Sequence, residues 1–192
     1  MIIAGSSVSE LEVIREWYAY NARSRQGYLD CFAKLPRDEF LRDRGASYPS
    51  MLRIFEHTMG AYYYWLNMAS SDNPRLPRFG PLEDWSENPS VAELADAERR
   101  LQDIMYKFLE SLTEGDLELT FVRKGKDSAR DQVLTVREML WHLVEEDLQH
   151  RGELNALLWQ IDVDPPIFNW IEWSKLRKEQ PQPEARPAPH SS

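Results

Sequence analysis

Apolar residues recur at spacings of three and four over four long segments of the chain, as they do on one face of an amphipathic helix. These predicted helices cover residues 11–32, 50–68, 90–112 and 135–161. Three of them open with the Ser/Thr-x-x-Glu pattern of a helix-capping box, namely Ser7-x-x-Glu10, Ser90-x-x-Glu93 and Thr135-x-x-Glu138. The pattern therefore predicts four main helices.

The segments between and after these helices differ in character. Residues 72–89 hold four prolines, which excludes regular structure and leaves a connection long enough to cross the length of a bundle. Two short β-prone runs, 117–122 and 132–136, predict a small hairpin or an irregular loop before the last long helix. A short terminal helix is expected at 167–177, and residues 179–192, rich in Pro, Gln and Ser, are expected to be disordered.

Together these elements predict an all-α fold. The expected architecture is a four-helix bundle with a long Pro-rich crossover, a short hairpin before the last long helix and a short C-terminal helix. A chain of 192 residues with 42% hydrophobic content can bury one substantial core, and nothing marks a second. We therefore expect one helical bundle domain over residues 1–178, followed by the tail.

Composition narrows the location and the partners. Residues 1–9 lack the basic start and apolar stretch of a secretory signal, and no apolar run reaches the roughly 20 residues that span a bilayer. The single cysteine, Cys31, cannot form an internal disulfide, which agrees with a reducing compartment. We expect a cytoplasmic protein without a membrane partner. The formal net charge of −9, with only short, mixed basic clusters, argues against nucleic acid as a partner.

Candidate chemistry lies in the last long helix, in the run His142-x-x-x-Glu146-x-x-x-His150. Residues four apart share one face of a helix, and imidazoles beside a carboxylate are typical ligands of a divalent metal. Helical histidines are also common at surfaces and in hydrogen-bonded cores, and such a pattern arises easily by chance. His57 strengthens the metal hypothesis, because it lies mid-helix among aromatic residues where an unpaired imidazole is poorly accommodated.

The same helix carries a heptad-like stripe that predicts which side chains face the core. Its members are Met139, Leu143, Glu146, His150, Glu153 and Leu157. An unpaired carboxylate at an inward position would cost several kcal/mol, so Glu146 is expected to be paired, protonated or metal-bound. Asp147, three residues before His150, is a weaker ligand candidate than Glu146.

These residues resemble a known family. The run 50–57, the Tyr64-Trp65-Leu66 sequence, and the His150-Arg151-Gly152-Glu153 end of the last long helix are similar to the DinB/YfiT-like group of metalloenzymes, over about residues 11–173. The resemblance implies a four-helix bundle, often a homodimer, with one divalent metal held by three side chains. It also implies a small-molecule substrate, since several relatives are transferases or isomerases that use mycothiol, bacillithiol or glutathione.

Carried over residue by residue, the resemblance assigns the metal to His57, Glu146 and His150. Many relatives have histidine at the position of Glu146, and a carboxylate leaves zinc, nickel, iron and manganese all open. His142 is expected to support the site from beside it, because one extra helical turn, about 6 Å, strains a shared coordination sphere. Glu153 could orient His150, and Arg151 could hold an anionic substrate or a thiol carboxylate, although surface salt bridges would explain both residues equally well.

The leading functional hypothesis is a metal-dependent transferase or isomerase that joins a low-molecular-weight thiol to a small electrophile. A metal-dependent hydrolase and a non-catalytic bundle that binds a metal or a small ligand are the alternatives. A solvent-open pocket beside the metal would favour an enzyme, whereas filling by Tyr63, Tyr64, Trp65 and Trp141 would favour the non-catalytic bundle. A ferritin-like di-metal site would need two Glu-x-x-His motifs, and the chain has none.

Overall fold

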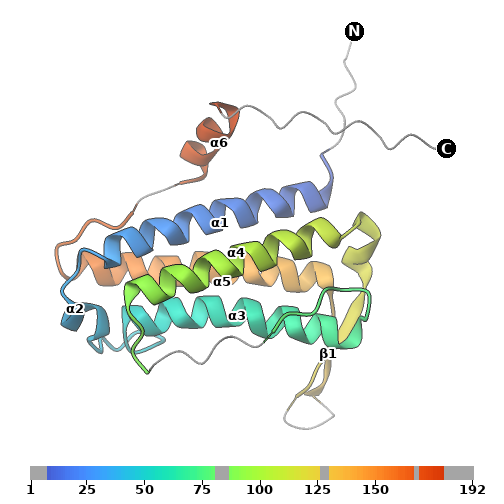
Figure 1. Ribbon diagram of the computed structural model, residues 1–192, viewed down its shortest axis with the longest axis horizontal. Helices are drawn as coiled ribbons and strands as arrows, with labels where there is room; N and C mark the ends of the chain where they lie inside the picture. The colour runs from blue at the N-terminus through green and yellow to red at the C-terminus, as the bar shows by residue number, and fades with distance from the viewer. Residues whose placement is uncertain (1–7, 81–86, 126–129, 167–168, 180–192) are drawn as a thin grey trace.

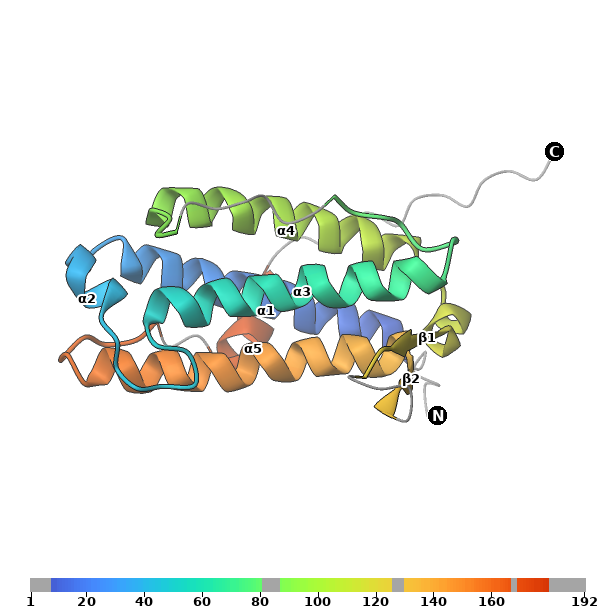
Figure 2. The ribbon, with the colours of Figure 1, turned by 90° about the horizontal axis from the view of Figure 1, so that it is seen from below.

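The computed structural model describes residues 8–80, 87–125, 130–166 and 169–179. Four long helices lie side by side along the long axis of the molecule (Figures 1 and 2). They are α1 (Glu10–Phe32), α3 (Met51–Asp72), α4 (Val91–Ser111) and α5 (Val136–Trp159). α3 packs against α5 and α4, and α1 packs against α4 and α5. The predicted all-α bundle is confirmed.

Capping boxes start three of these helices. The predicted boxes of Ser90 with Glu93 and of Thr135 with Glu138 are both present. In α1 the prediction was wrong by two residues, because the box pairs Ser9 with Glu12, and Ser7 lies outside the described residues. The Ser-rich start contains the pattern in two registers, and local sequence does not separate them.

The predicted hairpin forms between β1 (Thr120–Arg123) and β2 (Gln132–Thr135), which pair antiparallel. β1 starts later than the β-prone run because a 3-10 helix, η1 (Glu114–Glu118), occupies the first part of that run.

Burial alone would raise the pKa of Asp116 in η1, but hydrogen bonds from Thr113 and Arg75 outweigh it and hold the pKa below its usual value.

Smaller elements complete the chain. The short helix α2 (Arg37–Leu41) follows Pro36 and was not predicted, because its five residues are too few to show a period. The expected terminal helix is present as α6 (Trp170–Glu179). The described parts of the Pro-rich crossover, 73–80 and 87–89, contain no helix or strand, as expected. The tail expected to be disordered lies outside the described residues, apart from Glu179 at the end of α6.

A buried ionic network joins all four long helices at the centre of the bundle. Arg25 of α1 donates from Nε to both carboxylate oxygens of Glu98 in α4, at 2.9 and 3.0 Å. Its Nη1 donates to both oxygens of Asp147 in α5, at 2.9 and 2.7 Å, and to the hydroxyl of Tyr62 in α3 at 3.0 Å. The Tyr62 hydroxyl in turn donates to Asp147. A single guanidinium therefore fixes the relative positions of the four helices.

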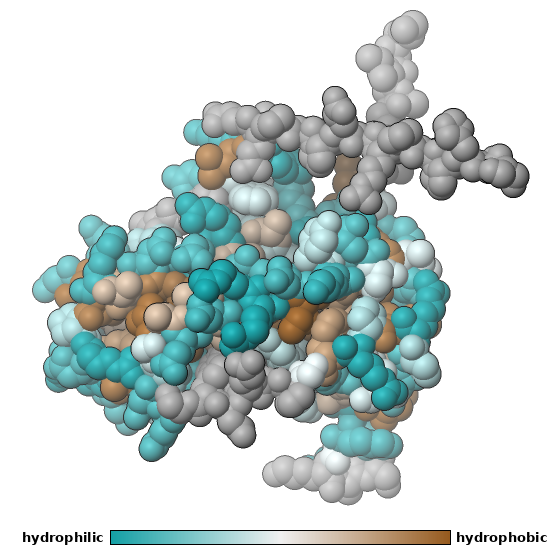
Figure 3. Space-filling view, viewed as in Figure 1, coloured by the Kyte–Doolittle hydropathy of each residue, from teal (hydrophilic) through white to brown (hydrophobic). Residues whose placement is uncertain are grey.

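Outside the core, hydrophilic side chains cover most of the face shown in Figure 3 and are interrupted by smaller apolar areas. Across the described ranges, every helix is either too short or too polar to span a lipid bilayer.

Candidate metal centre

α3 and α5 bring the three predicted ligands together. The Nε2 atoms of His57 and His150 each lie 3.2 Å from the same oxygen of Glu146, Oε2. One ligand atom from each residue lies within 4.8 Å of the other two. Ligand atoms bound about 2.1 Å from a tetrahedral ion are about 3.4 Å apart, so the cluster is close to the size that a metal ion needs.

The proton positions on His150 also suit a cation. Its Nδ1 lies 2.8 Å from a carboxylate oxygen of Glu153, which can only accept, so Nδ1 carries the proton in the neutral imidazole. The Nε2 lone pair then faces an oxygen of Glu146, and two lone pairs at that distance repel each other. A cation between these atoms removes the repulsion, so the donor set fits a divalent metal.

Neighbouring side chains hold the cluster in place. The hydroxyl of Ser47 donates to Glu153 at 2.7 Å. Burial by itself would raise the pKa of Glu153, but hydrogen bonds from His150 and Ser47 outweigh it and lower the pKa. The ring of Tyr48 stacks on His57 with centroids 4.1 Å apart and meets the ring of His150 edge-on. The loop that follows α2 therefore supports both imidazoles.

Exposure differs among the three candidate ligands. His150 is 3% exposed, whereas the side chains of Glu146 and His57 are 18% and 31% exposed. Burial lowers the pKa of His57, against the opposing effect of Glu146, and so favours the neutral imidazole that a metal requires. The cluster is thus anchored in the core on the side of His150 and open on the side of His57.

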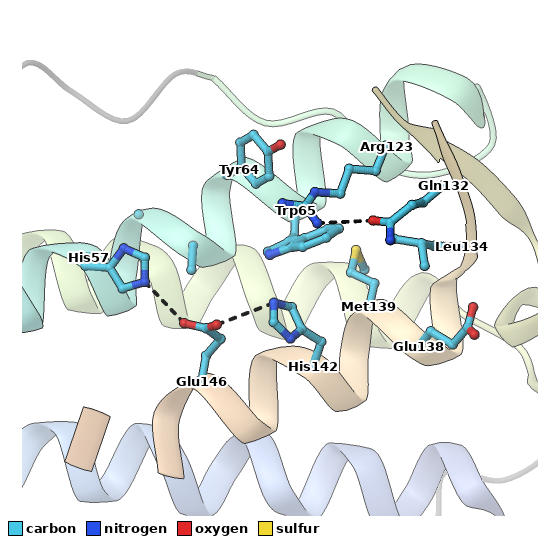
Figure 4. A pocket seen from close by; sticks show the side chains of 12 residues that line it. His57, Tyr64, Trp65, Arg123, Gln132, Leu134, Glu138, Met139, His142 and Glu146 are labelled. Carbon is cyan, nitrogen blue, oxygen red and sulfur yellow. Dashed lines mark hydrogen bonds and ion pairs between the residues drawn. The ribbon is translucent and has the colours of Figure 1, made fainter. Parts of the chain in front are cut away.

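A cavity of about 650 Å³ adjoins this open side. Its lining includes His57 and Glu146 of the cluster, together with Tyr64 and Trp65 of α3 and Met139 of α5 (Figure 4). The cavity is large enough to admit a small ligand. Of the aromatic residues expected to fill the site, Tyr64 and Trp65 line the cavity, Tyr63 belongs to the core, and Trp141 donates to Glu10.

His142 lies between the cluster and the rest of the cavity. Its Nε2 is 3.5 Å from the other oxygen of Glu146, Oε1, and its ring meets Trp65 edge-on with centroids 5.0 Å apart. It therefore contacts a candidate ligand from beside the cluster, in the place expected of a supporting residue. Figure 4 shows His57 and His142 approaching Glu146 from opposite sides.

Comparisons with known proteins show the family of this chain. A family model described as the DinB family matches residues 7–184, almost the whole chain. The chain belongs to the DinB family. The curated Protein DinB of Bacillus subtilis (strain 168) is 23% identical to this DinB-family protein over 145 residues, which cover 74% of this chain and 83% of that protein.

A solved structure supports the fold of this DinB-family protein. The crystal structure of a DinB-like protein from Bacillus cereus ATCC 10987 matches with a TM-score of 0.62 at 20% sequence identity. The match covers 81% of this chain and 95% of that chain. At this level of identity the likeness shows the fold alone.

The directions expected for the carboxylates of α5 in the DinB-family protein need correction. The stripe placed Glu146 and Glu153 toward the core, but both are only partly buried, and Asp147 instead turns inward to Arg25. Glu146 and Asp147 are about 100° apart around the helix, and Arg25 supplies the buried partner for one of them. Asp147, considered earlier as a weaker ligand candidate, is therefore committed to the ionic network.

Glu153 and Arg151, which the sequence treated alike, have different contacts in the structure. Glu153 contacts His150, as expected of an orienting residue. Arg151 points to α1, where it donates to the hydroxyls of Tyr20 and Ser24, and it does not line the large cavity. The side chain of Arg151 is therefore directed to α1 and not into the cavity of the DinB-family protein.

Sequence reasoning missed two residues near the site. Tyr48 lies in a loop without periodicity, and only its aromatic character in a polar segment could have drawn attention to it. Arg123 lines the cavity from β1, although it is far in sequence from the metal motif. Its place at the start of a polar stretch, directly after a β-prone run, gave no indication of that contact.

Proposed function

We propose that this DinB-family protein is a metal-dependent enzyme, namely a transferase or isomerase that uses a low-molecular-weight thiol on a small electrophile. His57, Glu146 and His150 would hold one divalent transition metal. The observation that carries the proposal is that this three-ligand cluster opens onto a cavity of about 650 Å³. Three protein ligands and an open side are typical of catalytic metal sites, whereas closed four-ligand sites are structural.

Each side chain has a role that follows from its contacts. Glu153 holds the proton of His150 at Nδ1, which directs the Nε2 lone pair toward the cluster. Tyr48 stacks on His57 and so covers one face of that imidazole. A bound divalent cation would lower the pKa of a thiol or water molecule that reaches its open positions.

The wall of the cavity favours a ligand with an apolar part. Trp65 and Met139 line it between the cluster and the hairpin, and Leu134 lines it from the hairpin, so a substrate would lose contact with water as it enters. This lining agrees with a small organic electrophile. A metal-activated water could use the same geometry, which makes a hydrolase the alternative within enzymes.

Metal content is the first test of the proposal. Protein purified without chelators should contain about one transition metal per chain by elemental analysis. His57→Ala and Glu146→Gln should abolish it, and Glu146→Gln keeps the shape of the side chain so that folding is preserved. His142→Ala is the matched control, because His142 touches Glu146 but is not one of the three candidate ligands. Full metal content in Glu146→Gln, or no uptake of zinc, nickel, iron or manganese by the wild type, would contradict the proposal.

Thiol use is tested separately on the metal-loaded protein. With glutathione and chlorodinitrobenzene, we expect consumption of thiol that depends on the metal and is lost in Glu146→Gln. Product formation that is independent of thiol would favour the hydrolase. Full metal content without turnover on a panel of thiols and electrophiles would favour a non-catalytic metal-binding bundle.

A further inference from the structure

The end of the large cavity farthest from the metal cluster is formed by the β1–β2 hairpin. Arg123, Gln132 and Leu134 line it there, whereas His57 and Glu146 line the other end. Figure 4 shows Trp65 between these two groups of side chains. Along α5 the lining extends from Glu146 back to Glu138, eight residues or about 12 Å. The cavity is therefore elongated, with different chemistry at its two ends.

Arg123 is held in position by two contacts. Register pairs it with Gln132 across the hairpin, and its Nη1 donates to the side-chain oxygen of Gln132 at 3.2 Å. Its guanidinium carbon lies over the ring of Trp65, 5.3 Å from the centroid. A guanidinium stacked on an indole keeps its planar edge available for a second, charged partner.

Among the described residues, Arg123 has no carboxylate within ion-pair distance. The nearby cation Lys124 is already paired with Asp131 at 2.9 Å. The carboxylate at this end of the cavity, Glu138, accepts from the backbone N–H and the hydroxyl of Thr135 in the cap of α5. A guanidinium without an ionic partner in the described part of the chain therefore lies exposed to solvent at the end of a largely apolar cavity.

We propose that Arg123, with Gln132 and Trp65, forms a subsite for a carboxylate carried by one of the two reactants. The ligand would place its reactive group at the metal cluster, its apolar middle along Trp65 and Met139, and its carboxylate against the hairpin. A guanidinium binds a carboxylate through two parallel N–H donors, which fixes the orientation of the ligand as well as its affinity. The metal end of this arrangement rests on the proposed function, whereas the carboxylate end does not.

The first arm of the test asks whether the thiol carries the carboxylate. Cobalt-loaded protein is titrated with mercaptopropionate, mercaptohexanoate and mercaptooctanoate, and with the mercaptoalcohols of the same lengths, while the thiolate–cobalt absorption band is followed. We expect one of the longer acids to bind about tenfold more tightly than its alcohol, the effect of a hydrogen-bonded charged group. Arg123→Met should remove this preference without changing the affinity for the alcohols.

The second arm asks whether the electrophile carries the carboxylate, and it does not need a metal. Metal-free protein and cobalt-loaded protein saturated with mercaptoethanol are titrated with octanoate and with octanol by calorimetry. We expect octanoate to bind more tightly than octanol in the wild type but not in Arg123→Met. Lys124→Met is the matched control, since it removes the same charge from the next residue of the chain and should leave both preferences intact.

The outcomes separate the two proposals. An Arg123-dependent preference for carboxylate in either arm supports the subsite, and the arm in which it occurs identifies the reactant. No preference in either arm, or an equal preference in Arg123→Met, overturns the subsite even if cobalt and thiols bind. If cobalt does not bind at all, the proposed function fails, and calorimetry on the metal-free protein still decides whether the subsite exists.

Discussion

Replacing Arg25 by methionine should destabilise the bundle more than almost any other single substitution. The guanidinium is the only cation that contacts both Glu98 and Asp147 among the described residues. Methionine fills most of the same volume but leaves both carboxylates without a cationic partner, and of their described contacts only the hydrogen bonds from Tyr62 to Asp147 and from Gln102 to Glu98 remain. Glu98 is 0% exposed and Asp147 is 7% exposed, so water cannot replace the lost contacts.

The magnitude follows from the burial of the two carboxylates. Removing one partner of a buried ion pair costs about 3–5 kcal/mol, because the other charge stays buried without compensation. Two carboxylates share one cation here, so we expect a loss near the upper end, about 4–5 kcal/mol. Folded domains are stable by about 5–15 kcal/mol, which makes this loss a large part of the total.

Urea unfolding followed by far-ultraviolet circular dichroism measures the effect. The matched control is Arg99→Met in α4, which removes an exposed arginine paired with Asp96 and should cost less than about 1 kcal/mol. Adding Glu98→Gln and Asp147→Asn to Arg25→Met should restore about half of the loss, because neutral amides are less costly to bury than unpaired charges.

Acidification gives an independent check. Burial raises the pKa of Glu98 and outweighs the lowering effect of Arg25, and removal of Arg25 should raise that pKa further. The folded variant then takes up this proton at a higher pH than the unfolded chain, so the deficit should be smaller at about pH 5 than at about pH 7. A loss under about 1 kcal/mol, or a triple variant no more stable than Arg25→Met, would refute this account of the network.

Three further predictions concern single side chains. Glu153→Gln should weaken metal binding about 10–100-fold, because the amide no longer orients His150 as the carboxylate does. Competition with a chelator measures the affinity, and Glu145→Gln, a substitution of an exposed glutamate in the same helix, is the control. Equal affinities of the two variants would contradict the orienting role. Asp116→Asn should cost about 1–2 kcal/mol at neutral pH in thermal unfolding. The pKa of Asp116 is lowered in the folded state, so its stabilisation is complete above the unfolded value of 3.8 and is lost as the pH falls from there toward the lowered folded pKa. The deficit of the variant should therefore shrink over that range, and a deficit independent of pH would refute this. Burial raises the pKa of Cys31, so iodoacetamide should alkylate this thiol more slowly in the folded than in the unfolded protein at mildly alkaline pH. Mass spectrometry measures the two alkylation rates, and equal rates would contradict the prediction.

Local sequence was sufficient for much of the bundle. The caps at Ser90 and Thr135, the four apolar periods and the hairpin all depend on residues close together in the chain, and each was predicted. The histidines and Glu146 were identified by helical spacing together with the family resemblance. The structure brings His57 to the other two across two helices, as the resemblance implied.

Two kinds of feature were not predicted. The 3-10 helix η1 and the short helix α2 have too few residues to show a period in the sequence, and the first cap had two possible registers. Features that depend on partners from other segments were the second kind. In α5, adjacent residues differ by about 100° in direction, so the sequence could not decide which carboxylate faces the core. That choice was made by Arg25, which lies 122 residues away from Asp147.

The proposed carboxylate subsite shows the same division. The sequence left open whether Arg151, beside His150, holds an anion or forms a surface salt bridge, and in the folded chain its side chain turns toward Tyr20 of α1. Arg123 reaches the cavity instead, because the hairpin folds over α3 and carries it to Trp65. The sequence by itself determined the helices and the chemical types available for a metal site, since these follow from local periodicity and spacing. Only the tertiary structure decided which charged side chains face that site, because their direction is set by the packing of segments distant in the chain.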